Sequence, residues 1–441
     1  MIEKITKVIV EIISAAIPFR KFRRNVRSKM LRYRISLLFK VRITPNIKRL
    51  RTENKRIRVG FLVVYDSCFQ MESVYQAMLM DNDFSPRIYV IPDTSRGEAF
   101  CKHTLAHTFN FLSSKYGKDN VQLPIENGVY QDISAMFDIC TTMNPYSAST
   151  HKYYSIPYLS SKGVPVFFSK YYFENGEIWS KSFYSIPDLR FLWRFYIEND
   201  NVRTMATVGK IFSEMGSRIL TVGYPKSDLL LEKCKTIRHR TRARVIIAPH
   251  HSIDPTAEYN IGNFVAYKEL FLQLPSLYPQ IDWVFRPHPL LMVNMIKLGY
   301  WTEKDMDEYL FKMTKYSNVE YQNGGEYFDT FVNSDAMIQD CGSFLPEYFY
   351  TSHPQCFILR NKDHSLKMFP TRWGQLLLDN VYKAYSETDI LKFINEVVVD
   401  KDDYMMVARQ QFFDTNLKAS RGEKCASLII SDIKNQLNMK L

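Results

Sequence analysis

RVIIAPHH, residues 244–251, is the stretch that decides the fold class of this chain. Four consecutive apolar residues form a short run that is typical of a buried strand, and Pro249, His250 and His251 follow it at once. The polar and basic segment 235–243 separates this run from an earlier series of strands and helices. A strand that starts again after such a break predicts a second α/β domain.

The same alternation of patterns continues on both sides of the break. A strand, a helix and another strand in succession indicate parallel sheets built from crossover units. Upstream, we predict strands at 57–64, 86–93, 137–145 and 163–172, helices at 71–81 and 103–117, and a strand that feeds a helix over 218–234. Downstream, we predict strands at 244–251, 281–285, 319–321, 336–340 and, as the last, 356–359, with helices at 263–279 and 303–316.

These patterns predict an α/β protein with two Rossmann-like domains of parallel sheet, at 57–235 and 236–399, that face a cleft. The length of 441 residues exceeds one ordinary core, and 46% hydrophobic with 24% charged residues is typical of a folded protein. Residues 400–441 have a helical pattern, and we expect them to cap the second domain or cross back to the first. The seven cysteines form no C-x-x-C pair, which favours a reducing cytoplasm over a disulfide or zinc framework.

Positive charge concentrates at the start of the chain. Residues 1–58 hold 18 Lys or Arg against three acidic residues, whereas the other 383 residues hold 40 basic and 43 acidic ones. The net charge of +12 therefore comes from an appendage. A nucleic-acid enzyme more often distributes its basic charge along a groove of the folded domain, so we expect no nucleic acid among the partners.

Residues 1–56 are predicted to be a basic amphipathic segment. Isoleucines recur at helical spacing up to Pro18, and residues 19–42 mix apolar side chains with many Arg and Lys. These runs are too short and too charged to span a bilayer. The pattern favours a helix on an anionic membrane surface, where each basic side chain contributes about 1 kcal/mol. A basic arm that binds RNA and a helix packed on the protein are the alternatives.

Candidate ligand-binding side chains follow three predicted strands of the second domain. Doubly wound sheets bind their ligands outside the carboxyl ends of the strands. The residues at these ends are His250 and His251, then Arg286 and His288 in the proline-flanked run RPHP, and then Asp340, Gly342 and Ser343.

The third strand end has the pattern of a phosphate site. SDAMIQDCGSFLPEY, residues 334–348, crosses a short strand and turns into a predicted helix. Ser343 suits the N-cap of that helix, and Gly342 lets a ligand approach the backbone closely. Free N–H groups at a helix start bind phosphate, although a simple helix cap would show the same residues.

The order of three motifs resembles a known family. APHHSI at 248–253, FRPHPLL at 285–291 and YFDTFVNSDAMIQDCGSFLPEY at 327–348 are similar to the donor-binding domain of the CDP-glycerol glycerophosphotransferase family. These are GT-B-like enzymes that build teichoic acids and related capsules. The resemblance covers residues 240–360, and it implies a GT-B-like fold for the whole chain.

The resemblance also implies roles for matching residues. It makes His288 catalytic, assigns the donor pyrophosphate to Ser343 and the Gly342 backbone, and lets Asp340 order the turn. The same motifs contain the further donor-site candidates Arg286, His250, Ser334, Asp335 and Glu347.

Two positions depart from the pattern of that family. Gly342 stands where the family usually has the first of two serines. The acceptor region of the family has H-G-T-P-x-K, with its histidine as the base, whereas the corresponding stretch 162–176 here contains no histidine. The base must therefore come from elsewhere, and the candidates are His251, Glu174 and Asp66.

The resemblance implies transfer of glycerol phosphate, or a related alditol phosphate, from a CDP-linked donor to a hydroxyl of a glycan or lipid-linked acceptor. It places the protein peripherally on the cytoplasmic face of the bacterial cell membrane. We expect His288 to act as an imidazolium, because adjacent phosphate raises the pKa of a histidine above about 6.5. No cofactor and no metal are expected. A GT-B glycosyltransferase that uses a nucleotide sugar and a non-catalytic nucleotide-binding scaffold are the alternatives.

Overall fold

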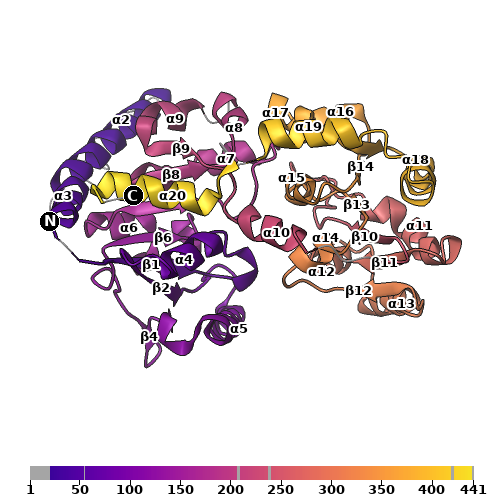
Figure 1. Cartoon of the computed structure of the whole chain (residues 1–441), viewed down its shortest axis with the longest axis horizontal. Helices are drawn as coiled ribbons and strands as arrows, with labels where there is room; N and C mark the ends of the chain where they lie inside the picture. The colour runs from indigo at the N-terminus through magenta and orange to yellow at the C-terminus, as the bar shows by residue number, and fades with distance from the viewer. Residues whose placement is uncertain (1–19, 54, 206–208, 237–239, 419–421, 440–441) are drawn as a thin grey trace.

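Two α/β domains lie side by side in the computed structural model, which describes residues 20–53, 55–205, 209–236, 240–418 and 422–439 (Figure 1). The N-terminal domain is built on a parallel sheet with the strand order β3-β2-β1-β6-β7-β8-β9. Its strands are β1 (Ile57–Val63), β2 (Phe84–Val90), β3 (Val121–Gln122), β6 (Ile139–Thr142), β7 (Val166–Ser169), β8 (Arg194–Ile197) and β9 (Ile219–Thr221). A short antiparallel hairpin of β4 (Ile125–Glu126) and β5 (Val129–Tyr130) lies outside this sheet.

The helices of this domain alternate with its strands, as parallel crossover connections require. They are α4 (Glu72–Leu79), α5 (Glu98–Tyr116), α6 (Ile156–Ser161), α7 (Ser180–Tyr184), α8 (Asp200–Thr204), α9 (Gly209–Met215) and α10 (Ser227–Cys234). The strands β3 and β8 were not predicted. β3 has only two residues, and β8 lies inside a continuous aromatic run that shows no boundary in the sequence.

The C-terminal domain has a second parallel sheet with the order β12-β11-β10-β13-β14-β15. Its strands are β10 (Arg244–Ala248), β11 (Asp282–Phe285), β12 (Val319–Tyr321), β13 (Ala336–Gln339), β14 (Gln355–Ile358) and β15 (Tyr382–Ala384). The prediction that β14 is the last strand is wrong, because three residues of β15 extend the sheet. The helices are α11 (Phe264–Leu277), α12 (Leu291–Lys297), α13 (Glu303–Thr314), α14 (Phe328–Val332), α15 (Phe344–Tyr348), α16 (Lys362–Met368), α17 (Arg372–Leu378) and α18 (Glu387–Lys392), which continues as the π-helix η9 (Phe393–Val399).

The last part of the chain joins the two domains. Helix α19 (Met406–Asn416) packs on the C-terminal domain through Phe412, whose ring lies 5.0 Å from that of Phe349. Helix α20 (Cys425–Leu437) crosses back to the N-terminal domain, where Figure 1 shows it in yellow beside β8 and α4. Lys434 forms ion pairs there with Asp81 at 2.9 Å and Asp83 at 2.7 Å. Both expected placements of residues 400–441 are therefore realised, one by each helix.

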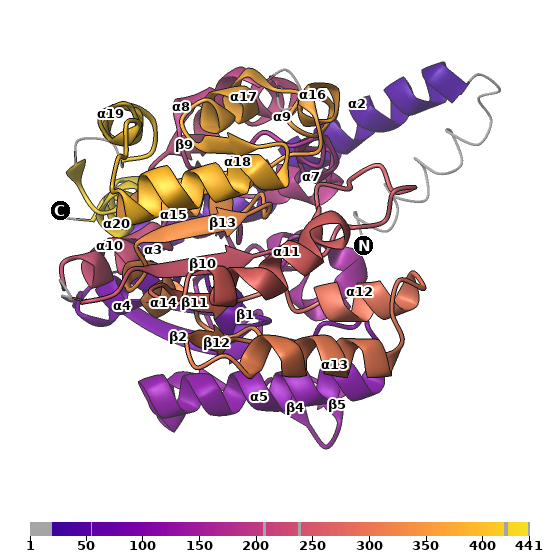
Figure 2. The same ribbon diagram turned by 90° about the vertical axis from the view of Figure 1, so that its right-hand side faces the viewer.

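The basic N-terminal segment is not a separate appendage over its described part. It forms α2 (Arg20–Leu38), the π-helix η1 (Phe39–Ile43) and α3 (Thr44–Thr52), and α2 projects from the body of the protein at its start and meets the N-terminal domain toward its end (Figure 2). Ile35, Ile43 and Leu50 are buried. The predicted helix before Pro18 lies outside the described residues. Within them, no helix combines the length and the apolarity that crossing a bilayer requires.

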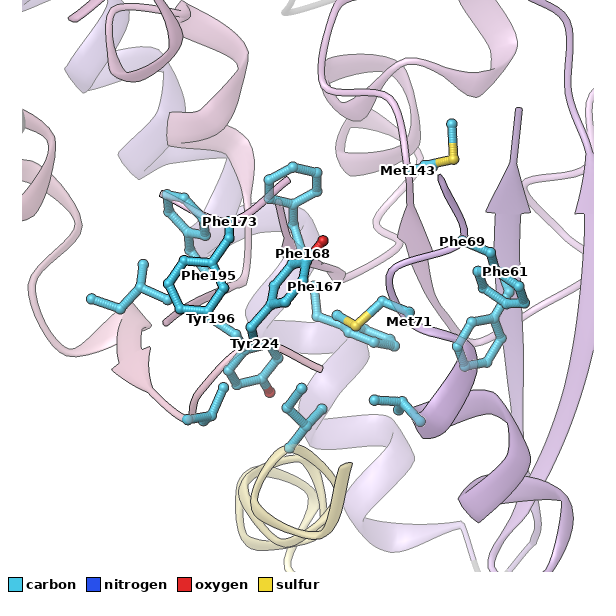
Figure 3. Packing of buried hydrophobic residues seen from close by; sticks show 14 of the residues in the cluster. Phe61, Phe69, Met71, Met143, Phe167, Phe168, Phe173, Phe195, Tyr196 and Tyr224 are labelled. Atoms are coloured by element: carbon cyan, nitrogen blue, oxygen red, sulfur yellow. The ribbon is translucent and has the colours of Figure 1, made fainter. Parts of the chain in front are cut away.

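Aromatic side chains dominate the core of the N-terminal domain. Phe61 of β1, Phe167 of β7 and Tyr196 of β8 lie on one face of the sheet, and Phe168 and Phe195 pack together on the other (Figure 3). The rings of Phe61 and Phe167 meet edge to face at 6.3 Å. Such contacts add about 0.5–1.5 kcal/mol per pair beyond the burial of apolar area.

Both faces of the C-terminal sheet are covered. On β10, Val245 and Ile247 belong to one hydrophobic cluster, while Ile246 and Ala248 belong to the other, which continues into the N-terminal domain. A parallel strand buried on both faces appears in sequence as an unbroken apolar run, which is why VIIA was recognisable. The polar ends of such strands are then the places left for ligands.

Candidate functional site

Three histidines meet at the carboxyl ends of β10 and β11. The ring centroids of His250 and His251 are 4.4 Å apart, those of His251 and His288 4.1 Å, and those of His250 and His288 5.2 Å. The strands pair in parallel, so their ends lie at one edge of the sheet. The sequence placed these residues on two strand ends, and the tertiary structure brings them into one cluster.

Backbone contacts fix the two loops that carry the histidines. The His288 N–H donates to the Pro249 carbonyl at 3.0 Å. The buried Asp340 carboxylate, at the end of β13, accepts the His250 N–H at 2.6 Å and the Asn263 N–H at 2.5 Å. Asp340 therefore orders the loops around it, and burial raises its pKa to about 7.

Hydrogen bonds also fix the tautomer of each imidazole. The Leu290 N–H donates to His288 Nδ1 at 3.1 Å, and the Ser252 N–H donates to His250 Nδ1 at 3.3 Å. The Asn294 amide nitrogen donates to the His251 carbonyl at 2.9 Å, so the group that lies 3.2 Å from His251 Nδ1 is also a donor. Each Nδ1 is an acceptor, and each neutral ring consequently carries its proton on Nε2.

The protonation state agrees with these tautomers. Burial, together with the smaller effects of the charges of His251 and Arg96, lowers the pKa of His288 to about 3. Burial and the neighbouring histidines hold the pKa of His250 well below its usual value, and burial also lowers that of His251. The Leu290 N–H that faces Nδ1 favours the neutral ring of His288, and the imidazolium expected beside a bound phosphate stays a prediction.

The same tautomers decide whether the cluster suits a metal. If one ring nitrogen is taken from each histidine, the three nitrogens lie within 4.8 Å of one another. Within the described ranges, no other three His, Cys, Asp or Glu residues form such a group. A metal needs the lone pair of a ring nitrogen. Since Nδ1 accepts a hydrogen bond and Nε2 carries the proton, the three rings are arranged as donors to an anion.

Arg286 follows β11, two residues before His288, and is buried. Its guanidinium donates to Gln322 Oε1 at 2.7 Å and to the Gly325 carbonyl at 2.6 Å, and it faces the Tyr327 ring at 5.7 Å. Burial lowers its pKa from the usual value. These hydrogen bonds go to neutral acceptors, so they orient the positive charge without neutralising it.

Glu347 belongs to a different network at the junction of the domains. It is buried, which raises its pKa, and it accepts a hydrogen bond from the Tyr327 hydroxyl. That hydroxyl also accepts from Lys226 Nζ at 2.9 Å, and Lys226 donates to the Ser67 carbonyl at 2.9 Å. Lys226 and Tyr327 were missed. Lys226 follows β9, a strand end that the same rule of parallel sheets would have selected.

The turn at Gly342 and Ser343 differs from the predicted phosphate cradle. Ser343 precedes α15 but makes no capping hydrogen bond, and its hydroxyl lies 3.3 Å from Cys341 Sγ. Helix α15 has only five residues before it tightens to a 3-10 turn. A side chain at position 342 would overlap the carboxylate of Glu177, a residue of the N-terminal domain. The space over the Gly342 backbone is therefore filled by a carboxyl group of the protein itself.

Ser334 and Asp335 do not belong to the site. They stand at the amino end of β13, whereas Asp340 stands at its carboxyl end. The Ser334 hydroxyl is buried against the Phe331 carbonyl and Tyr348, and the Asp335 carboxylate accepts the Arg244 N–H at 2.7 Å. Ser334 and Asp335 therefore stabilise the start of β13, and neither is a donor-site residue.

The three candidate bases lie in different surroundings. Glu174 is fully buried and pairs with Lys170 at 2.5 Å. Burial opposes its ionisation, but Lys170 and the hydrogen bonds from Ser180 and the Gly176 N–H together hold the pKa below its usual value. Asp66 follows β1 and lies 3.6 Å from His107. The ion pair with Lys170 encloses Glu174, so we exclude Glu174 as the base. His251 lies within the histidine cluster.

The two parallel sheets and their helices form a GT-B-like fold, which is shared with solved structures. No family model matches the sequence, and no curated protein matches it.

Solved structures show which proteins share the fold. A UDP-GlcNAc 2-epimerase from Neisseria meningitidis, bound to UDP-GlcNAc, has a TM-score of 0.54 and 11% identity over 86% of this chain and 98% of the epimerase. A second UDP-N-acetylglucosamine 2-epimerase has a TM-score of 0.56 and 10% identity over 88% and 97%. A variant of the wall teichoic acid polymerase TagF has a TM-score of 0.51 and 13% identity over 94% and 96%. At such identities the likeness establishes the fold.

Proposed function

We propose that this chain is an enzyme of cell-envelope glycan synthesis that binds the phosphates of a nucleotide-activated donor at the histidine cluster. One observation carries the proposal: His250, His251 and His288 have their Nδ1 atoms occupied by N–H donors, which leaves three Nε2–H groups for an anion. Arg286 adds a positive charge whose hydrogen bonds go to neutral groups. Arg96 of the opposite domain adds another positive charge, which lowers the pKa of His251 and of His288.

The proposed reaction is an in-line displacement. An acceptor hydroxyl loses its proton to a base and attacks the distal phosphorus of a CDP-linked alditol, and the bond from that phosphorus to CMP breaks. The negative charge that develops on CMP is stabilised by Nε2–H of His288 and by Arg286, both fixed before the donor binds. A preorganised donor of this kind contributes about 10²- to 10³-fold to a rate.

Two kinds of support favour a CDP-linked donor. The RPHP and SDAMIQDCGS motifs resemble those of the CDP-glycerol glycerophosphotransferase family. TagF, a wall teichoic acid polymerase whose structure with CDPG is known, shares the fold at a TM-score of 0.51 and 14% identity over 96% of this chain.

The second candidate is an enzyme that uses a nucleotide sugar. The UDP-GlcNAc-bound epimerase has a similar TM-score of 0.54, and a diphosphate leaving group fits the same three donors. In that case attack occurs at the anomeric carbon of the sugar. A non-catalytic scaffold would bind the donor without turning it over.

A membrane surface is the proposed location. The described basic residues of α2 and η1, such as Lys29, Lys40 and Arg42, are exposed beside the exposed apolar side chains Tyr33 and Val41. An anionic leaflet attracts each such cation by about 1 kcal/mol. Charge reversal at Lys40 and Arg42 should weaken co-sedimentation with anionic vesicles, whereas reversal at Lys304 and Lys312 of α13 should leave it unchanged. Equal binding by both variants would reject this location.

Nucleotide release tests the proposed reaction and separates its alternatives. Purified protein is incubated with CDP-glycerol, other CDP-alditols, UDP-sugars and GDP-sugars, each with and without a lipid-linked acceptor. We expect acceptor-dependent release of CMP. Release of UDP would favour the sugar transferase, and donor binding without release of any nucleotide would favour the scaffold.

A further inference from the structure

Glu177 is a buried carboxylate at the junction of the domains, on the segment that follows β7. It is 8% exposed. Its Oε1 accepts a hydrogen bond from the Tyr259 hydroxyl of the C-terminal domain at 2.7 Å, and its N–H donates to Asn175 Oδ1 at 3.1 Å. The carboxylate lies so close to Gly342 that a β-carbon there would overlap it. Glycine at 342 and glutamate at 177 are therefore structurally linked.

Glu177 is near the histidine cluster through two contacts. The Tyr259 ring that carries the donor hydroxyl lies edge to face with the His250 ring, with centroids 6.0 Å apart. Asp340, two residues before Gly342, accepts the His250 N–H. Glu177 is therefore linked to the histidine cluster through the Tyr259 ring and through the turn that joins Asp340 to Gly342.

The charges around Glu177 differ from those around Glu174, three residues earlier. Lys170 contacts Glu174 and Glu198, at 2.5 and 3.6 Å, and the hydrogen bonds of the Glu177 side chain come from neutral groups. Burial is the main reason that the pKa of Glu177 is raised to about 7; Glu174 adds to the shift, and Tyr259, Asn175 and Lys170 oppose it. The Cys341 thiol faces it from the C-terminal domain. A carboxylate that gains and loses its proton near neutral pH suits acid–base catalysis.

We propose that Glu177 is the base that deprotonates the acceptor hydroxyl. It stands next to the stretch 162–176, which lacks the histidine that the family resemblance assigns to this role. The inference rests on the proposed transfer function.

The step is balanced within the groups named. The acceptor O–H proton passes to the Glu177 carboxylate as the acceptor oxygen forms its bond to the distal phosphorus, and CMP leaves with the electron pair of the broken P–O bond. The proton on Glu177 then passes to solvent or to CMP. Glycine at 342, where the family usually has a serine, leaves room for the Glu177 carboxylate. That carboxylate would replace the histidine that the stretch 162–176 lacks, so the two departures from the family pattern have one structural explanation.

The test is Glu177→Gln, since glutamine can still accept from Tyr259 and keep the packing. We expect turnover to fall 10²- to 10⁴-fold with donor Kd within threefold, and the acidic limb of the pH–rate profile to disappear. Tyr259→Phe should shift that limb to higher pH, because it removes a hydrogen bond that stabilises the carboxylate. Glu258→Gln, next to Tyr259 but exposed, is the matched control and should retain the wild-type rate and profile.

The outcomes separate this inference from the function on which it rests. A wild-type enzyme that turns over a donor, together with a Glu177→Gln variant that keeps its rate and its acidic limb, would overturn the role of Glu177 alone. A wild-type protein that releases no nucleotide from any donor would overturn both. A Glu177→Gln variant that melts earlier yet is fully active per folded molecule would make the residue structural.

Discussion

Two polar clusters near the domain junction differ in how their charges are compensated. Lys170, Glu174 and Glu198 form a closed set in which the Lys170 ammonium contacts both carboxylates. His250, His251 and His288 face one another with their Nδ1 atoms bonded, and no carboxylate of the described residues pairs with their rings. A compensated cluster stabilises the fold, whereas a set of donors without an acceptor is suited to a ligand.

The largest expected effect comes from the histidine cluster. His288→Ala should lower turnover 10²- to 10⁴-fold, because it removes an N–H donor from the developing charge on CMP. The melting temperature should change little, since the lost bond to the Leu290 N–H is one hydrogen bond near a partly exposed side chain. Turnover and melting are measured on the same preparation. A variant that melts much earlier but keeps its rate when folded would show that His288 braces the fold.

A change in the cluster of Lys170, Glu174 and Glu198 should lower stability and leave turnover nearly unchanged, the opposite of the effect of His288→Ala. Glu174→Gln leaves Lys170 with Glu198 as its remaining carboxylate, and we expect the free energy of unfolding to fall by about 3 kcal/mol. Denaturant titration measures it. The folded fraction should keep a near-normal turnover, because Glu174 is enclosed away from the ligand. A large loss of turnover per folded molecule would mean that the two clusters are functionally coupled.

A smaller effect concerns the pH dependence of stability. The pKa of Glu177 is raised to about 7 in the folded state from about 4.5 when unfolded, so the folded state binds more protons between these values. The stabilisation by protonated Glu177 is complete below about pH 4.5 and is lost as the pH rises to about 7. Comparing wild type with Glu177→Gln at pH 5 and pH 8, we expect their difference in unfolding free energy to change by about 1–3 kcal/mol. A difference that is constant with pH would contradict the raised pKa.

The smallest expected effect is an absence of proton uptake by the histidines. Because each Nδ1 faces an N–H donor, the rings should remain neutral when the donor phosphates bind. Calorimetry of CDP-glycerol binding at pH 6.5, in two buffers that differ in ionisation enthalpy, should give a proton uptake that is the same for wild type and His288→Ala. One proton more in the wild type would restore the imidazolium expected from the sequence.

Much of the fold was accessible from local sequence patterns. The apolar run at 244–248 and the helical spacing at 303–314 correctly predicted β10 and α13, because both patterns depend on neighbouring residues alone. The strands β3, β8 and β15 were missed. β8 lies inside an aromatic run, and β3 and β15 are too short to show a period, although the equally short β12 was predicted. The notion of a separate basic appendage was wrong for its described part, since Ile43 and Leu50 look like residues of an isolated amphipathic helix until the surface that buries them is known.

The sequence by itself determined the two parallel sheets, the order of the motifs and the candidate histidines, because strand ends follow from the apolar pattern. Only the tertiary structure decided which candidates act together. It placed Ser334 and Asp335 at the wrong end of β13, enclosed Glu174 with Lys170, and brought Glu177 against Gly342 across 165 positions of sequence. Protonation state and accessibility depend on groups that are distant in the chain, and a local pattern contains no information about them.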